Sequence, residues 1–228
     1  NDTSMSKDVH TVLQWAQEQG VVYEHATLLD IGAGTGTFSI PLAALHVKVT
    51  AIDPSSKMLD ILNEDARNAG LSGIVTHQSY WDDFTINAPY DIVLASMTPA
   101  IHDRPTIDKM IAASQKYGIY VTWGRYRINQ VVNALLRVHH AEEFSSDLSS
   151  IETFMERLRH TSFVFQSTTF ETSWSDTYSF EEAKVYAYEQ LERRNITPDE
   201  KSVEACLKEY LHDGHVNVET KAEKAVIV

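Results

Sequence analysis

Three glycines stand at alternate positions directly after a short apolar run, in the segment Leu28-Leu29-Asp30-Ile31-Gly32-Ala33-Gly34-Thr35-Gly36. Because glycine carries no Cβ, a backbone with this spacing can turn sharply and approach a ligand closely. The segment that follows predicts a helix over residues 38–45, and the N-terminus of that helix faces the same ligand. The loop is therefore the first candidate for a binding site.

A carboxylate ends the next predicted strand, about 20 residues further on, at Asp53. In this position it can accept hydrogen bonds from two ribose hydroxyls. Sites for dinucleotides and for S-adenosylmethionine share both features. A nicotinamide site would have its third glycine or alanine three residues after Gly34, where this chain has Thr37. The spacing therefore disfavours a nicotinamide cofactor, although it leaves that alternative open.

Helical and strand patterns alternate around these residues. Helices are predicted over 6–19, 38–45, 55–68 and 108–116, and strands over 27–31, 47–52, 74–77, 90–95 and 118–122. This alternation indicates an α/β protein with a Rossmann-like three-layer sandwich, in which a mostly parallel sheet has helices on both faces. Residues 163–173 and 216–228 predict an antiparallel C-terminal strand or hairpin. Ligands of such sheets bind at the carboxyl ends of the strands.

The length of 228 residues suits one domain, so residues 1–228 are expected to form a single domain. Two helices at about 180–212 are expected to be an insertion or cap on that domain. Their starts carry capping-box patterns, Ser179 with Glu182 and Thr197 with Glu200, with Pro198 at the first helical position of the second helix.

The combined pattern resembles the class I S-adenosylmethionine-dependent methyltransferases over about residues 28–123. The loop from Asp30 to Gly36 resembles the first motif of that superfamily. Asp53-Pro54-Ser55 followed by Met58-Leu59 looks like the second motif, and Tyr90-Asp91-Ile92-Val93 resembles the strand that leads to the acceptor site.

The resemblance implies S-adenosylmethionine as the cofactor and assigns roles to particular residues. Asp30 and the glycine backbone would hold its methionine part, and Asp53 would hold the ribose. The adenine would lie against the segment from Ser79 to Asp82, where the commonest family pattern has Gly-Asp in place of Ser79-Tyr80. The predicted cofactor-binding residues are Asp30, Gly32, Ala33, Gly34, Gly36, Asp53, Pro54, Met58, Tyr80, Trp81, Asp82 and Ser96.

Methyl transfer from a sulfonium needs little from the protein beyond alignment of the acceptor, and a general base helps only where the acceptor must lose a proton. His102 and Asp103, just beyond the fourth predicted strand, are the candidates for that base. The preceding segment Ser96-Met97-Thr98-Pro99 lacks the Asn/Asp-Pro-Pro-aromatic signature of enzymes that methylate amide or exocyclic amino nitrogens, so those acceptors are disfavoured.

The composition of the chain limits the classes of molecule that it can bind. The formal net charge is −13, from 32 acidic and 19 basic residues, and a field of that sign repels a phosphate backbone. We therefore expect a small-molecule acceptor and no nucleic acid.

The chain has no run of about 18 apolar residues and opens without a signal peptide, so no membrane association is expected. A single cysteine, Cys206, fits a cytoplasmic protein. The adjacent pair His139-His140 has no spaced partners, so no metal site is predicted.

Three hypotheses about function remain after this reading. The first is an S-adenosylmethionine-dependent methyltransferase for a small molecule. The second is a nicotinamide-dependent oxidoreductase on a similar sheet, and the third is a non-catalytic cofactor-binding module with a protein partner. The sequence does not indicate which acceptor atom is methylated or which oligomer forms.

Overall fold

The computed structural model describes residues 6–142 and 149–228 and divides into two compact units. The described part of the first unit covers residues 6–122, 149–169 and 225–228. The second unit has described residues 123–142 and 170–224. The expectation of a single domain with a helical cap remains a prediction.

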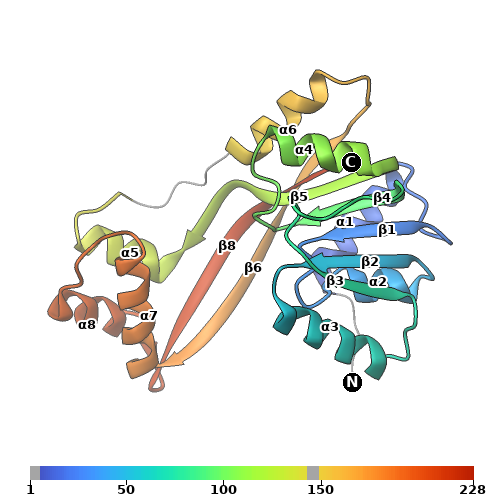
Figure 1. Cartoon of the computed structure of the whole chain (residues 1–228). Helices are drawn as coiled ribbons and strands as arrows, with labels where there is room; N and C mark the ends of the chain where they lie inside the picture. Colours follow the sequence, from blue (N-terminus) through green and yellow to red (C-terminus); the bar gives the residue numbers. More distant parts are fainter. Residues whose placement is uncertain (1–5, 143–148) are drawn as a thin grey trace. The chain divides into compact units, whose positions relative to one another are not determined.

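Four short strands form the centre of the first unit: β1 (Thr27–Ile31), β2 (Lys48–Asp53), β3 (Ile74–Gln78) and β4 (Tyr90–Ser96). They run parallel to one another and to the start of β5 (Ser114–Asn129), in the order β3-β2-β1-β4-β5 (Figure 1). Because parallel strands all end at the same edge of the sheet, the loops after β1, β2, β3 and β4 meet there. The predicted binding residues follow these four strands.

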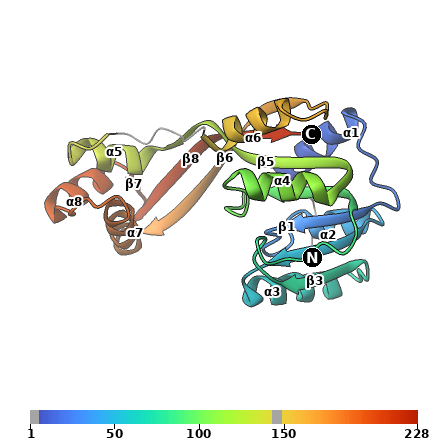
Figure 2. The ribbon, with the colours of Figure 1, turned by 45° about the horizontal axis from the view of Figure 1, so that its top comes forward.

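Helices cover both faces of this sheet. The helices α1 (Lys7–Glu18), α2 (Ser39–Ala44) and α3 (Ser56–Asn68) lie on one face. On the other face, α4 (Arg104–Ala113) lies against β4 and packs with α6 (Ser149–Arg159) (Figure 2). The core under α4 and α6 consists of buried residues from both layers: Leu29, Ile31, Ile52, Trp81, Val93, Ala95, Ile101, Ile107, Met110, Ala113, Tyr120, Phe154, Leu158 and Ile227.

A polar anchor joins the starts of three strands at the opposite end of the sheet. The Asp91 Oδ2 atom accepts hydrogen bonds of 2.9 Å from both the backbone N–H and the hydroxyl of Thr27. The Lys116 ammonium lies 2.8 Å from Asp91 Oδ1. Lys116 and Thr27 therefore lower the pKa of Asp91 to about 2. This anchor ties the starts of β1 and β4 to β5.

Three long strands continue the sheet beyond β4. Their order is β5-β8-β6, with β8 (His215–Ile227) between β5 and the edge strand β6 (Ser167–Ser179). The strands in this part of the sheet are antiparallel, as predicted for the C-terminal region. A short strand, β7 (Leu211–His212), forms an antiparallel hairpin with the start of β8. Each of the three long strands has residues in both units, so the backbone crosses the boundary three times within strands.

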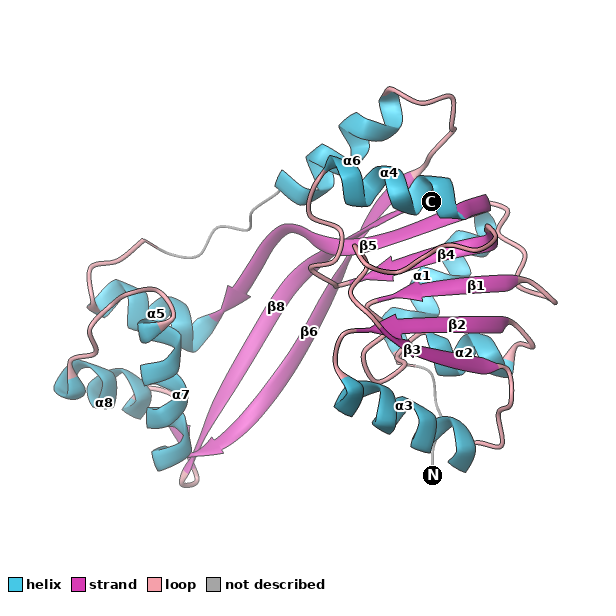
Figure 3. Ribbon diagram, viewed as in Figure 1, coloured by secondary structure: helices cyan, strands magenta, loops and turns pink. Residues whose placement is uncertain are grey.

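The second unit has its own helices and its own core. The helices α5 (Gln130–Val138), α7 (Phe180–Glu192) and α8 (Glu200–Lys208) contact one another (Figure 3). Lys184 of α7 pairs with Glu204 of α8 at 2.7 Å. The buried cluster contains residues of these helices and of β8: Val131, Val132, Ala134, Leu135, Leu136, Ala183, Ala187, Leu191, Val203, Cys206, Leu207, Val216 and Val218.

Most predicted elements of the first 100 residues are confirmed, while several later boundaries are wrong. The fourth predicted helix, 108–116, begins at Arg104 instead, because Asp103 caps it, and ends at Ala113. The last helix is capped by Asp199, which accepts a hydrogen bond from the Ser202 N–H, and not by Thr197. The capping box of Ser179 and Glu182 is confirmed.

No helix within residues 6–142 and 149–228 is long and apolar enough to cross a membrane. The cytoplasmic location remains a prediction.

Candidate active site

The glycine loop after β1 has the backbone shape that the sequence predicts. Gly32, Gly34 and Gly36 have φ angles of 69°, 56° and 87°, in the left-handed region that side chains disfavour. The N–H groups of Gly32 and Ala33 both donate to the carbonyl oxygen of Ile52 in β2, at 2.9 and 3.0 Å. The loop is thus fixed to the neighbouring strand.

The three glycines meet different surroundings. A Cβ at Gly32 would lie 2.2 Å from the Thr98 hydroxyl oxygen, and one at Gly36 would lie 2.8 Å from the Leu62 side chain. A Cβ at Gly34 would meet no atom within 4 Å. Gly32 and Gly36 therefore allow close packing of the protein on itself, whereas Gly34 leaves open space beside the loop where a ligand can approach the backbone.

Asp53 at the end of β2 is directly bonded to this loop. Its Oδ2 atom accepts a hydrogen bond of 3.0 Å from the Gly34 N–H, and its Oδ1 atom accepts one of 2.8 Å from the Ser55 N–H. A carboxylate has about four acceptor positions, so two remain for other donors. The structure therefore brings together two predicted parts of the site, the glycine loop and the acid on the next strand.

Asp30 lies beneath the loop and is 3% exposed. Its Oδ2 atom accepts a hydrogen bond of 2.7 Å from the Ser39 hydroxyl of α2. Burial raises the pKa of Asp30 to about 6, and the nearby negative charge of Asp53 adds to this effect, while the Ser39 hydrogen bond lowers it. A cation bound at the loop would stabilise the ionised form of Asp30.

The residues of the predicted adenine segment differ in their exposure. Tyr80 is 66% exposed, and Asp82 is exposed as well. Trp81 is only 3% exposed and belongs to the core of the first unit. Its indole N–H donates to the carbonyl oxygen of Thr106 at 3.1 Å, and the Lys109 ammonium lies 4.5 Å from its ring centroid. This burial disfavours Trp81 as a stacking partner of a ligand, so Tyr80 is the better candidate.

The remaining predicted cofactor residues lie at the same edge of the sheet. Met58 is exposed in the first turn of α3, and Pro54 is exposed beside Asp53. Ser96 ends β4 and is partly buried, whereas Ala33 is buried within the glycine loop and can offer its backbone only. Their contacts with a cofactor remain predictions.

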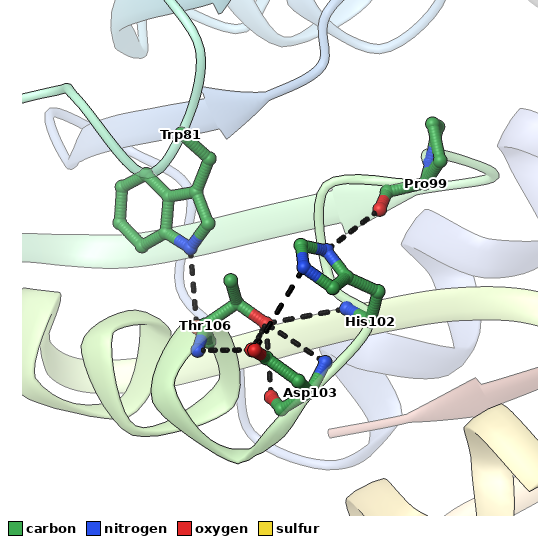
Figure 4. Close-up of polar contacts among 5 residues, drawn as sticks. All are labelled: Trp81, Pro99, His102, Asp103 and Thr106. Carbon is green, nitrogen blue, oxygen red and sulfur yellow. Dashed lines mark hydrogen bonds and ion pairs between the residues drawn. The ribbon is translucent and has the colours of Figure 1, made fainter.

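The two candidates for a general base are engaged in local structure (Figure 4). Asp103 caps α4: its Oδ1 atom accepts from the Thr106 N–H at 2.9 Å and from the Thr106 hydroxyl at 2.7 Å. These bonds hold the pKa of Asp103 below its usual value. The His102 ring contacts the Pro99 carbonyl oxygen at 3.2 Å and lies 3.8 Å from Asp103 Oδ2. Asp103 is thus a weak base with a structural role, which leaves His102 as the better candidate.

Two residues that the sequence does not mark individually, Thr98 and Met97, shape the loop after β4. Thr98 packs its side chain onto Gly32, and its hydroxyl also accepts a hydrogen bond of 3.2 Å from the Ala100 N–H. Met97, between Ser96 and Thr98, has a φ of 51°, an uncommon conformation for a residue with a long side chain. Strained backbone of this kind is concentrated at functional sites. No sequence signal marks the Thr98 contact, because its partner is 66 residues away.

A cavity of about 270 Å³ lies in the first unit at the other edge of the sheet, near the start of β5. Apolar side chains dominate its lining, including Met110, Phe154 and Phe165. None of the predicted site residues lines it.

Among the described residues there is no group of three or more His, Cys, Asp or Glu side chains that could hold a metal ion. His139 accepts a hydrogen bond of 3.1 Å from the Asp199 N–H.

Part of the chain is similar to known methyltransferases. Residues 28–117 match the family described as "Methyltransferase domain". The chain is 35% identical over 96 residues to an uncharacterized protein of Haemophilus influenzae, covering 42% of this chain and 36% of that protein. It is 39% identical over 75 residues to the ribosomal RNA small subunit methyltransferase G of an Exiguobacterium species, covering 30% of this chain and 32% of that enzyme.

Solved structures show the same fold. The magnesium protoporphyrin IX methyltransferase of Synechocystis, solved with bound S-adenosylmethionine, aligns with a TM-score of 0.52 at 15% identity, covering 95% of this chain and 77% of that chain. The chain spans about a third of the length of the curated relatives it matches. The family match lies entirely in the first unit and includes the glycine loop and Asp53, whereas the second unit lies outside it.

Proposed function

We propose that this chain is a methyltransferase of the class I S-adenosylmethionine-dependent superfamily that transfers a methyl group to a small-molecule acceptor, because residues 28–117 match the methyltransferase-domain family. The observation that carries the proposal is the hydrogen bond from the Gly34 N–H to the Asp53 carboxylate, together with the open space beside Gly34. This arrangement offers bare backbone to one part of a nucleotide-like ligand and a carboxylate to another.

The residues of the loop fit S-adenosylmethionine, the cofactor of this superfamily. The open side of Gly34 admits the amino-acid end of the cofactor, and the free acceptor positions of Asp53 suit the two ribose hydroxyls. Asp30, buried below, supplies a negative charge close to a cationic ligand. Tyr80, exposed after β3, offers a ring face for the adenine.

In methyl transfer, the role of the protein is to hold the cofactor and the acceptor and to align them. When bound, S-adenosylmethionine supplies a methyl group that is already activated by its positive sulfur. The loop after β4, from Ser96 to Pro99, follows the strand next to β1, and Thr98 fixes it against Gly32. We assign this loop to the placement of the acceptor. We assign to His102, three residues beyond Pro99, the role of taking a proton from acceptors that must lose one.

Charge supports a small acceptor. The net charge of −13 opposes binding of a phosphate backbone. The Synechocystis enzyme is named for a small-molecule substrate, whereas the Exiguobacterium relative is named for ribosomal RNA. That second name makes ribosomal RNA the competing acceptor. We favour the small molecule because the match to the RNA enzyme covers only 30% of this chain.

Two measurements test the proposal. Isothermal titration with S-adenosylmethionine and with its demethylated product should show binding of both; no heat at millimolar ligand contradicts the methyltransferase assignment. Transfer of a radioactive methyl group should then label a fractionated small-molecule extract and leave purified ribosomal RNA unlabelled. Label in the RNA alone refutes the small-molecule part, and binding of NADH without binding of the demethylated product favours an oxidoreductase. Cofactor binding without transfer to either, together with a stable co-purifying protein, favours the non-catalytic module.

A further inference from the structure

Arginine and tryptophan side chains gather on the strands of the second unit. The Arg127 guanidinium carbon of β5 lies 4.8 Å from the ring centroid of Trp123 and 5.8 Å from that of Trp174 in β6. The two indole rings are 6.2 Å apart and inclined by 31°. The Arg127 side chain therefore contacts two tryptophans from strands that are separated by β8 in the sheet.

A second cation lies beside the same rings. The Lys224 ammonium, on β8, is 5.8 Å from the Trp123 ring centroid. Two positive side chains thus stand close to one indole in a chain whose net charge is −13. We call these four residues, Trp123, Arg127, Trp174 and Lys224, the tryptophan–arginine cluster.

The contacts of Arg127 with the two rings do not occupy its N–H donors. A guanidinium over a ring uses its planar face, while its five N–H donors point outward in the plane. Within the described residues, Arg127 has no carboxylate or carbonyl partner for these donors, and it is exposed. Arg125, two residues earlier, differs because it holds the Glu223 carboxylate at 2.7 and 3.0 Å. Arg127 is thus held in place by rings while its donors remain open.

We propose that the tryptophan–arginine cluster binds the oxyanion of a small ligand with a planar apolar body. Arg127 would hold a carboxylate or phosphate group through paired N–H donors, which match the spacing of two oxyanion oxygens. Lys224 adds charge at short range, and the partly exposed side chains of Trp123 and Trp174 contact the planar body. The four residues lie outside the family match, so this site does not depend on the methyltransferase assignment.

Calorimetric titration of the full chain with four probes tests the site. 1-Naphthoate and 1-naphthyl phosphate carry an oxyanion on a planar body, 1-naphthalenemethanol is the neutral analogue, and acetate lacks the rings. We expect at least one naphthyl anion to bind at least about tenfold more tightly than either control, and the ratio of the two anions identifies the preferred oxyanion. Added salt should weaken this binding.

Matched variants locate the site. Arg127→Gln should weaken binding of the naphthyl anion by about tenfold or more, and Arg127→Lys should retain part of it. Arg193→Gln removes an exposed arginine elsewhere in the second unit and should change nothing. Lys224→Gln should have a smaller effect than Arg127→Gln. Circular dichroism and thermal melting of each variant separate loss of binding from loss of folding.

Several results overturn the proposal. These are the absence of binding by both naphthyl anions, equal binding of 1-naphthalenemethanol, and equal effects of Arg127→Gln and Arg193→Gln. Binding of a single-stranded RNA oligonucleotide that depends on Arg127, with none of the small anions bound, would also refute it and would assign the cluster to nucleic acid.

Discussion

The Asp53 carboxylate accepts a hydrogen bond of 3.0 Å from the Gly34 backbone N–H, which joins the end of β2 to the loop after β1. The two residues are 19 positions apart in the chain, and each supplies a different half of the proposed cofactor site. A ligand that spans both halves therefore meets a frame already fixed by the protein, so little ordering is needed when it binds.

Replacing Asp53 by Asn should weaken cofactor binding. The amide keeps the size of the side chain but loses its charge and one acceptor oxygen, so we expect a loss of about 1–3 kcal/mol, which is the range for hydrogen bonds to charged groups. Titration with the demethylated product of the cofactor measures it. Asp60→Asn, on the exposed side of α3, is the control and should bind normally. Equal affinities of the two variants would place the ribose elsewhere.

The paired variants Gly32→Ala and Gly34→Ala should separate folding from binding. At Gly32 the new methyl group collides with Thr98 and the backbone is left-handed, so we expect a loss of about 2–4 kcal/mol in the free energy of unfolding. At Gly34 the backbone is also left-handed but no atom lies within 4 Å, so the cost is about 1 kcal/mol.

The loss of cofactor affinity in Gly34→Ala should be larger than its modest loss of stability predicts. The methyl group at Gly34 occupies the space beside the loop, so Gly34→Ala should lose cofactor affinity although it is destabilised less than Gly32→Ala. Denaturant unfolding and calorimetry on the same preparations measure both quantities. Normal affinity of Gly34→Ala would show that the ligand does not approach this glycine.

Asp30 should make the stability of the first unit depend on pH in an unusual direction. Burial raises the pKa of this acid from 3.8 to about 6, so the folded state holds a proton that the unfolded state releases between these values. The free energy of unfolding therefore falls by about 3 kcal/mol as pH rises from about 4 to about 6. Asp30→Asn should remove this slope. Urea unfolding across pH 4–7 measures it, and identical slopes for the two proteins would contradict the assignment.

Asp91 should behave in the opposite sense. Its pKa is lowered to about 2 by Lys116 and Thr27, so its contribution to stability is fully present above its unfolded pKa and is lost as pH falls through about 2. Asp91→Asn should reduce the free energy of unfolding at pH 7 by about 2 kcal/mol, because the ionised acceptor of three contacts is lost. Asp83→Asn, at an exposed position, is the matched control. A difference of less than 0.5 kcal/mol between them, on the order of surface substitutions, would refute this role.

The sequence predicts the first four strands and the glycine loop well because their signals are local. β1 is bounded as predicted, and Ser6 caps α1 with Gly20 just after it. The pattern is weaker beyond residue 122, where the 16-residue β5 carries polar side chains such as Arg125 and Arg127, and the sequence predicts only 118–122 of this strand. It does not predict the helices α5 and α6.

Site residues follow the same division. The contact of Gly34 with Asp53 follows from strand order, which the sequence indicates, whereas the burial of Trp81 depends on a partner 25 residues away, the carbonyl group of Thr106. The capping role of Asp103 did have a local signal, because Pro105 stands two positions later, as at many helix starts. This signal indicates a structural role for Asp103.

The three boundary-crossing strands have a consequence for synthesis of the chain. The first unit includes Ala225–Val228, and Ile227 fills its core beside Phe154. A ribosome-bound chain therefore lacks part of this core until residue 228 has left the exit tunnel, by which time all of the second unit has emerged. Translation order thus makes the amino-terminal unit the last to become complete.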